Sequence, residues 1–126
     1  MNADTVLLRQ VTPAWIQSGR VTSQVFKPTP KDQKQLSVYD GDQITAFDSW
    51  RHYTEALGFA SVGVLGVSVA ECRSLHLDAR PDPEPFPEHA VIGFGELTNT
   101  QIEKKAKQLR GLAQARGWQY QADADA

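Results

Sequence analysis

The stretch VGVLGVSV at residues 62–69 is the most informative about the fold. It is short, continuous and rich in β-branched side chains, which is typical of a strand buried on both faces of a sheet. Gly63 and Gly66 interrupt it, and glycine inside a strand indicates a close approach of neighbouring chain or a bulge. We therefore expect a central strand here, with the remaining elements arranged around it.

Further apolar runs bounded by turn residues predict strands on both sides of this stretch. They are residues 5–11, 20–26, 36–39 and 89–94, with a short edge strand at 118–121. Residues 14–19 predict a single helical turn that ends at Gly19, and residues 27–35, which hold two prolines and three lysines, predict a surface loop.

The spacing of apolar residues changes after Thr45, where it becomes that of a helix. Thr45 with Asp48 resembles a capping arrangement, and Gly58 suits the C-terminal end. One buried helix face is expected to carry Phe47, Trp50, Thr54 and Leu57. The aromatic residues expected in the core are Trp15, Phe47 and Trp50.

A second helix is expected towards the C-terminus. Thr100 and Glu103 have the spacing of a capping box, and Gly117 suits the end of the helix. The apolar stripe of this helix is Ile102, Ala106, Leu109 and Ala113. Residues 122–126 are expected to fray.

Length and composition fit one globular domain over residues 1–126. The chain is 40% hydrophobic and 22% charged, which supports a packed core and excludes a disordered charged chain. Strands outnumber helices, so we expect an α+β fold with a mixed, mostly antiparallel sheet and two main helices. The net charge of −2 gives no overall attraction to nucleic acid or anionic membrane.

The compartment is inferred from cysteine usage and from the N-terminus. Cys72 is the single cysteine, so no intramolecular disulfide is possible. The first residues lack the basic flank and apolar run of a secretory signal, and no apolar run approaches the roughly 18 residues that span a bilayer. We expect a cytoplasmic protein that does not enter the membrane, and the oligomeric state stays open.

Reactive side chains form no recognisable catalytic or metal-binding motif. His52, His76 and His89 fall in different expected elements, and Asp40-Gly41-Asp42 is typical of a turn. Cys72 is expected to be a small packing residue, and no glycine-rich phosphate loop is present. We therefore expect no metal and no cofactor, and a non-enzymatic role is favoured.

Residues 79–88 mark the sharpest change in composition, with proline at every second position from Pro81 to Pro87. Such a segment is extended and exposed, and it docks at low entropic cost. The leading hypothesis is a small protein-interaction module, an adaptor or immunity-like partner of a larger bacterial protein. The residues expected to bind that protein partner are Asp82, Glu84, Phe86 and Glu88.

The C-terminal helix offers a different surface, because its polar positions are strongly basic. A lysine-rich helix face is commonly only a solvated face, whose stems cover apolar edges. Nucleic-acid binding stays an alternative, and it would use Lys104, Lys105, Lys107 and Arg110.

Residues 19–26 (GRVTSQVF), residues 36–39 (LSVY) and the helix after Thr45 together resemble small uncharacterised bacterial proteins. More distantly, the same order is similar to RES-type domains of the ADP-ribosyltransferase-like fold, which use NAD. The resemblance implies an NAD-handling alternative, whose site residues would be Arg9, Ser23, Tyr39 and Glu55. The chain departs from the family because the Gly-Arg strand continues Val-Thr where the family has Trp-Asn, and Glu55 lies too late on the helix. The chain therefore has no glutamate at the expected place on the helix, and breaking the nicotinamide bond needs such a carboxylate to stabilise the oxocarbenium ion.

Overall fold

The computed structural model describes residues 1–29 and 33–122 of the chain. Its centre is an antiparallel sheet with the strand order β6-β7-β4-β1-β5-β8. The strands are β1 (Val6–Val11), β4 (Gln35–Asp40), β5 (Gly63–Ser68), β6 (Asp78–Pro81), β7 (His89–Gly93) and β8 (Tyr120–Gln121). The α+β fold with a mostly antiparallel sheet is confirmed.

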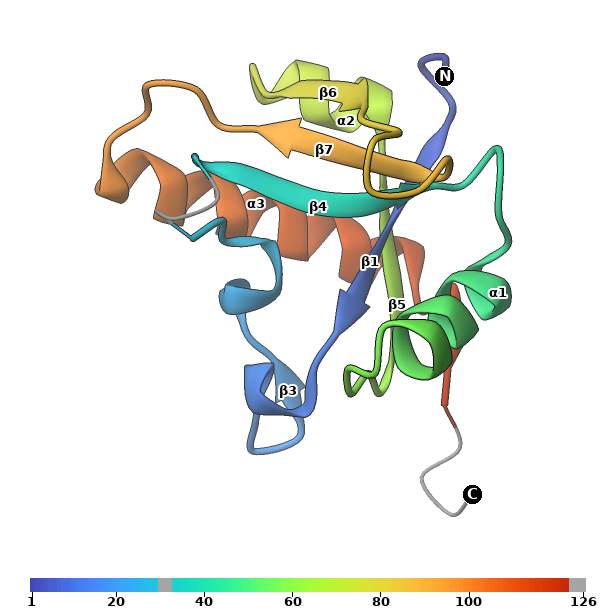
Figure 1. The fold of residues 1–126 in the computed structure, drawn as a ribbon. Helices are drawn as coiled ribbons and strands as arrows, with labels where there is room; N and C mark the ends of the chain where they lie inside the picture. The colour runs from blue at the N-terminus through green and yellow to red at the C-terminus, as the bar shows by residue number, and fades with distance from the viewer. Residues whose placement is uncertain (30–32, 123–126) are drawn as a thin grey trace.

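Helices cover both faces of the sheet (Figure 1). The long helix α3 (Asn99–Arg116) and the short helix α2 (Val69–Ser74) pack on one face. On the other face lies α1 (Ala46–Arg51), which continues into the π-helical turn η4 (His52–Ala56). The sequence predicted two main helices, and α2 is a third one that it missed.

The main hydrophobic core lies between α3 and the sheet. The predicted stripe of Ile102, Ala106, Leu109 and Ala113 is buried, which confirms the predicted face of this helix. The predicted cap at Thr100 and Glu103 is wrong. Thr98 caps the helix instead, through reciprocal hydrogen bonds with Gln101. Thr98 and Gln101 have the same spacing two positions earlier. There the two side chains accept hydrogen bonds from backbone N–H groups that have no partner within the helix.

Strand β5 is buried along its whole length, as predicted for a strand covered on both faces. A Cβ atom at Gly63 would lie 2.6 Å from the carbonyl oxygen of Tyr120, and one at Gly66 would lie 2.6 Å from Cγ1 of Val6. Both distances are shorter than van der Waals contact. Close packing therefore explains both glycines.

Helix α2 begins directly after β5, at a residue that the sequence placed inside the strand. Ser68 is the last residue of β5 and also the N-cap of α2, and its hydroxyl accepts a hydrogen bond from the backbone N–H of Glu71. The Glu71 carboxylate accepts one from the backbone N–H of Ser68. This is a complete capping box, and its Ser-x-x-Glu spacing was the overlooked signal for the helix.

Residues 13–26 differ from the expected helical turn and strand. A 3-10 turn, η1 (Pro13–Trp15), leads into a hairpin of β2 (Ile16–Gln17) and β3 (Arg20–Val21). A second 3-10 turn, η2 (Ser23–Phe26), replaces the rest of the predicted strand. Val25 and Phe26 are both fully buried. Neighbouring strand residues point to opposite faces, so a turn is what allows both side chains to enter one core.

Helix α1 and the π turn after it bury the predicted face only in part, because Trp50 and Thr54 are partly buried. Phe47 and Leu57 are 45% and 41% exposed, so their assignment to the buried face is wrong. Ser49 is buried in their place, and its hydroxyl accepts a hydrogen bond from the side-chain amide of Gln10 on β1 at 3.1 Å. A buried amide requires a partner, and the small Ser49 side chain lets the helix come close enough to provide one.

Two of the three aromatic residues expected in the core are partly buried. Trp15 packs against the main core, and Trp50 packs against the smaller core on the α1 side. Phe47 is not a core residue, since it stacks outside on Trp50 and Tyr120 with ring centroids 6.2 and 5.1 Å apart.

The predicted loop at residues 79–88 is shorter than expected, because its first three residues belong to the edge strand β6. We call residues 82–88 the Pro-rich loop from here on. The predictions for residues 30–32 and for the tail at residues 123–126 lie outside the described residues. Among residues 1–29 and 33–122, no helix has the length and hydrophobicity to cross a bilayer.

Candidate functional site

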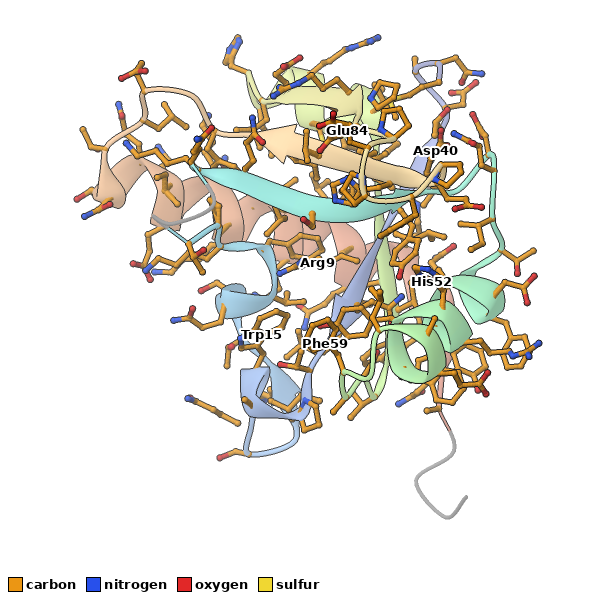
Figure 2. The ribbon with its side chains drawn as sticks, in the orientation of Figure 1. Arg9, Trp15, Asp40, His52, Phe59 and Glu84 are labelled. Atoms are coloured by element: carbon orange, nitrogen blue, oxygen red, sulfur yellow. The ribbon has the colours of Figure 1, made fainter. Side chains whose placement is uncertain are left out.

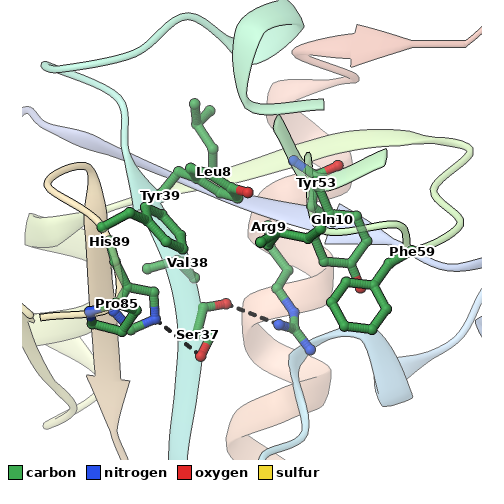
Figure 3. Close-up of a pocket in the computed structure, with 12 residues that line it drawn as sticks. Leu8, Arg9, Gln10, Ser37, Val38, Tyr39, Tyr53, Phe59, Pro85 and His89 are labelled. Carbon is green, nitrogen blue, oxygen red and sulfur yellow. Dashed lines mark hydrogen bonds between the residues drawn. The ribbon is translucent and has the colours of Figure 1, made fainter. Parts of the chain in front are cut away.

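An open cavity of about 580 Å³ lies on the α1 side of the sheet (Figure 3). Its floor comes from β1 and β4, and its walls come from the segment after α1 and from the Pro-rich loop. This volume is in the range of small-molecule and side-chain binding sites. The lining residues are Leu8, Arg9, Gln10, Ser37, Val38, Tyr39, Tyr53, Leu57, Phe59, Pro85, Phe86 and His89.

The cavity exists because β1 and β4 separate. They pair only at Leu7 with Asp40 and Leu8 with Tyr39, whereas β1 pairs with β5 along its whole length. Beyond these two pairs, the Arg9 side chain bridges the gap. It donates hydrogen bonds to the carbonyl oxygens of Val25 at 2.7 Å and Ser37 at 2.8 Å.

The guanidinium of Arg9 is also held from the side of η1. Its Cζ atom lies 4.9 Å from the ring centroid of Trp15, which is a cation–π arrangement. Figure 2 shows Arg9 pointing from the floor of the sheet towards Trp15 and Phe59. The arginine is therefore fixed in place before any ligand arrives.

The π-helical turn η4 places two side chains over the sheet. The backbone N–H of Leu57 donates to the carbonyl of His52, which widens the last turn of the helix. This turn brings His52 against Tyr39 on β4, with 2.8 Å between Nδ1 and the phenol oxygen. It also brings Tyr53 into the cavity. Such π turns occur often at functional sites.

Both cavity tyrosines stay protonated at neutral pH. Burial raises the pKa of Tyr39, and the charges of Tyr53 and Glu88 raise it further. Burial also raises the pKa of Tyr53, although the positive charge of Arg9 partly offsets the rise. The Tyr53 phenol therefore offers a hydrogen-bond donor to a bound group, whereas the Tyr39 phenol already contacts His52.

The Pro-rich loop forms the opposite wall through Phe86. The ring of Phe86 packs against Tyr39, His52 and His89, with centroid separations of 5.2, 4.5 and 5.2 Å. The loop is closed at its base by a backbone hydrogen bond from Asp82 to His89. His52 and His89, which the sequence placed in unrelated elements, thus meet around one aromatic ring. His76 lies away from this cluster and lines a different surface depression.

Ser37, His89 and Asp82 form a chain of polar contacts beside the cavity. The hydroxyl of Ser37 lies 3.1 Å from Nε2 of His89. Nδ1 of His89 lies 2.8 Å from the backbone carbonyl oxygen of Asp82 and 3.3 Å from its carboxylate. No sequence pattern predicted this arrangement, because 52 residues separate Ser37 from His89.

The NAD-handling alternative is met only in part. Arg9 and Tyr39 both line the cavity. Ser23 lies in η2 and Glu55 lies on the exposed side of η4, where its carboxylate pairs with Arg51 at 3.5 Å. Neither Ser23 nor Glu55 lines the cavity, so the fold brings together two of the four expected residues.

The residues expected to bind a protein partner have different environments. Glu84, whose position is labelled in Figure 2, is exposed and lies on the Pro-rich loop. Asp82 and Glu88 are partly buried, and Asp82 contacts His89. Phe86 is a partly buried wall of the cavity. The loop and the cavity are therefore one continuous surface.

The basic residues of the nucleic-acid alternative lie on α3, on the other face of the sheet from the cavity (Figure 1). Lys104 and Lys107 are exposed, whereas Lys105 and Arg110 are partly buried. Nucleic-acid binding by this helix stays a prediction.

Cys72 is fully buried, and burial, with the nearby charge of Glu71, raises its pKa to about 12. Its thiol is therefore protonated and inert at neutral pH. Across residues 1–29 and 33–122, no group of three or more His, Cys, Asp or Glu side chains could hold a metal ion.

Comparison of the chain with protein-family models, with curated proteins and with solved structures found no match. The functional interpretation therefore rests on the cavity and on the side chains around it.

Proposed function

We propose that the chain is a cytoplasmic protein-interaction module that binds a segment of a partner protein in the cavity and along the Pro-rich loop. The main support is the exposed apolar wall of the cavity. Phe59 and Leu57 are 57% and 41% exposed, and they stand opposite Pro85 and Phe86. Exposed aromatic side chains around a concave site are typical of the residues that dominate binding energy.

The charge of the loop indicates the chemistry of the partner. Residues 82–88 contain Asp82, Glu84 and Glu88 and no Lys or Arg. Acidic residues at the rim of a site speed the encounter with a basic segment and disfavour acidic ones. The partner segment is therefore expected to carry an aromatic or aliphatic anchor with Lys or Arg beside it.

A displayed peptide library tests this proposal. Peptides with one apolar anchor flanked by lysines are expected to be enriched over the same anchors flanked by glutamates. Phe59→Ser should weaken the binding of the enriched peptides by about 30-fold, which is the effect of losing a 2 kcal/mol hot spot. The matched control is Phe47→Ser, because Phe47 is similarly exposed but lies outside the cavity lining. Equal losses in the two variants would contradict the proposal.

Charge reversal tests the part played by the loop. Glu84→Lys is expected to lower the affinity several-fold and to weaken its salt dependence. Glu96→Lys changes an exposed acid away from the cavity and should leave the affinity unchanged. The triple change of Asp82, Glu84 and Glu88 to lysine should abolish binding. Undiminished binding by that variant would remove the loop from the interface.

NAD binding is a second candidate, supported by the presence of Arg9 and Tyr39 in the same cavity. A ligand at a hundred times its dissociation constant stabilises the folded state by about 2.7 kcal/mol. Millimolar NAD should therefore raise the melting temperature of the wild-type chain, and Tyr39→Phe should reduce the increase. Without an increase in melting temperature, this candidate has no support.

A further inference from the structure

We propose that Ser37, His89 and Asp82 form a nucleophilic centre that hydrolyses a carboxylic ester held in the cavity. This activity goes beyond the binding function proposed above. It rests on the order of the contacts, in which the Ser37 hydroxyl meets Nε2 of His89 at 3.1 Å and Nδ1 of His89 meets Asp82. Serine, histidine and aspartate in this order are a recurrent solution to acyl transfer on unrelated folds.

The hydrogen bonds fix the tautomer that a general base needs. The backbone carbonyl of Asp82 can only accept a hydrogen bond, so Nδ1 of His89 carries the proton and donates it at 2.8 Å. Nε2 is then unprotonated and accepts the hydrogen bond of the Ser37 hydroxyl. The Asp82 carboxylate, 3.3 Å from Nδ1, stabilises the imidazolium that forms when His89 takes the proton.

The nucleophile is exposed and the base is buried, as the reaction requires. Ser37 is exposed and lines the cavity, so its oxygen is accessible to a substrate. His89 is only 8% exposed, and the Phe86 ring packs against it in a T-shaped contact. Backbone hydrogen bonds from Asp82 to His89 and from His89 to Phe86 tie the loop to the base. The base is thus held rigidly while the nucleophile stays open.

Arg9 supplies positive charge next to the nucleophile. Its guanidinium donates a hydrogen bond to the carbonyl oxygen of Ser37 itself, as Figure 3 shows. Tyr53 adds a phenol to the same cavity. The positive charge of Arg9 and the phenol of Tyr53 thus line the same cavity as the nucleophile, and groups of these two types stabilise the oxyanion of a tetrahedral intermediate.

The reaction balances with water as the only co-reactant. The Ser37 oxygen bonds to the ester carbonyl carbon while its proton passes to Nε2 of His89. The bond from that carbon to the alcohol oxygen then breaks, and His89 gives the proton to the departing alcohol. Water next attacks the acyl-serine, with His89 again taking the proton, and the proton returns to Ser37 as the carboxylic acid leaves. The apolar part of the ester would pack between Phe59 and Phe86.

The test combines covalent labelling with ester hydrolysis. A fluorophosphonate probe is expected to give one adduct, which peptide mass spectrometry places on Ser37. The wild-type chain is also expected to hydrolyse p-nitrophenyl butyrate. Ser37→Ala should abolish both signals, whereas Ser74→Ala, at an exposed serine on α2, should leave both unchanged. His89→Gln should slow hydrolysis at least a hundredfold, which is the range of general-base catalysis.

Asp82 is tested as a positioning residue. Asp82→Asn keeps the backbone carbonyl and removes the charge, so kcat should fall with KM unchanged, and Asp82→Glu should restore part of the loss. The melting temperature of each variant shows whether it folds. An unlabelled Ser37 in the folded wild-type chain, or hydrolysis that persists in Ser37→Ala, would overturn the proposal. Peptide binding by Ser37→Ala is measured separately, so the two proposals fail or succeed independently.

Discussion

The side chain of Arg9 on β1 donates a hydrogen bond to the backbone carbonyl of Ser37 on β4 at 2.8 Å. The last paired positions of these strands are Leu8 and Tyr39, so the contact lies just beyond the point where backbone pairing stops. A side chain thus replaces the missing ladder between two neighbouring strands. The cavity lies where the two strands separate. Arg9 spans this separation, and its side chain also lines the cavity.

Arg9→Met should destabilise the fold by about 2 kcal/mol. The substitution removes charge-assisted hydrogen bonds to two carbonyl oxygens, and hydrogen bonds of this kind contribute about 1.5–3 kcal/mol. Urea denaturation measures the change. Arg20→Met, at an exposed residue of the β2–β3 hairpin, should change stability by less than about 0.5 kcal/mol. Equal stability of the two variants would contradict this account of the bridge.

Glu71 should make the fold sensitive to acid. Burial alone would raise the pKa of Glu71, but the hydrogen bond and charge of Arg116, with the hydrogen bonds of Ser68, hold it below its ordinary 4.5. Because the folded-state pKa is depressed, this stabilisation is present above about pH 4.5 and is lost as the pH falls through the folded-state value. The expected contribution is about 1 kcal/mol.

Denaturation at a series of pH values measures this effect. Glu71→Gln should reduce the loss of stability that occurs as the pH falls below about 4.5, because the titrating group is gone. Arg116→Met should reduce it as well, since the 2.6 Å ion pair with Glu71 is removed. Variants as acid-sensitive as the wild-type chain would show that other groups control this range.

Cys72 should be unreactive until the chain unfolds. Its side chain is fully buried, and its pKa is raised to about 12 from an ordinary value near 8.5–9. A disulfide reagent such as DTNB should therefore not modify the native chain at pH 8, although it should react fully in guanidinium. Rapid stoichiometric labelling of the native chain would contradict the burial.

Two glycine-to-alanine changes should have opposite signs. At Gly63 a Cβ would lie 2.6 Å from the backbone oxygen of Tyr120, so Gly63→Ala should destabilise by about 1–3 kcal/mol. Gly111 lies in α3 with nothing within 4 Å of an added Cβ, so Gly111→Ala should stabilise by about 1 kcal/mol. Melting temperatures of the two variants, measured in one buffer, show both changes in stability. If both variants were destabilised, or both stabilised, this account of the two glycines would be wrong.

The sequence predicted most of the regular elements because their patterns are local. The continuous apolar run at residues 62–69 gave β5, and the stripe from Ile102 to Ala113 gave the buried face of α3. It failed where two elements share a residue, as at Ser68, and where a turn buries two neighbours, as at Val25 and Phe26. At Ser68 the Ser-x-x-Glu spacing was a local signal that was overlooked, whereas the burial of both Val25 and Phe26 depends on packing against distant segments.

The sequence named separate residues of the candidate site but not their arrangement. Arg9 and Tyr39 were named from a resemblance, and Asp82 and Phe86 from the composition of the loop, but nothing in the sequence linked Ser37 to His89 or Tyr39 to His52. These pairs depend on the register of β4 with β7 and on the π turn after α1. Hydrogen bonds of a few ångströms across 13 to 52 residues are fixed only when the sheet has formed.

By itself the sequence determined the α+β class, the buried strand β5, the apolar face of α3 and the acidic, proline-rich character of residues 82–88, because propensity and periodicity act over a few neighbouring residues. Tertiary structure alone decided that β1 and β4 separate, that Arg9 bridges them, and that Ser37, His89 and Asp82 meet beside the opening. The physical reason is that hydrogen bonding and packing between distant segments are settled by strand register and by what each buried polar group needs as a partner.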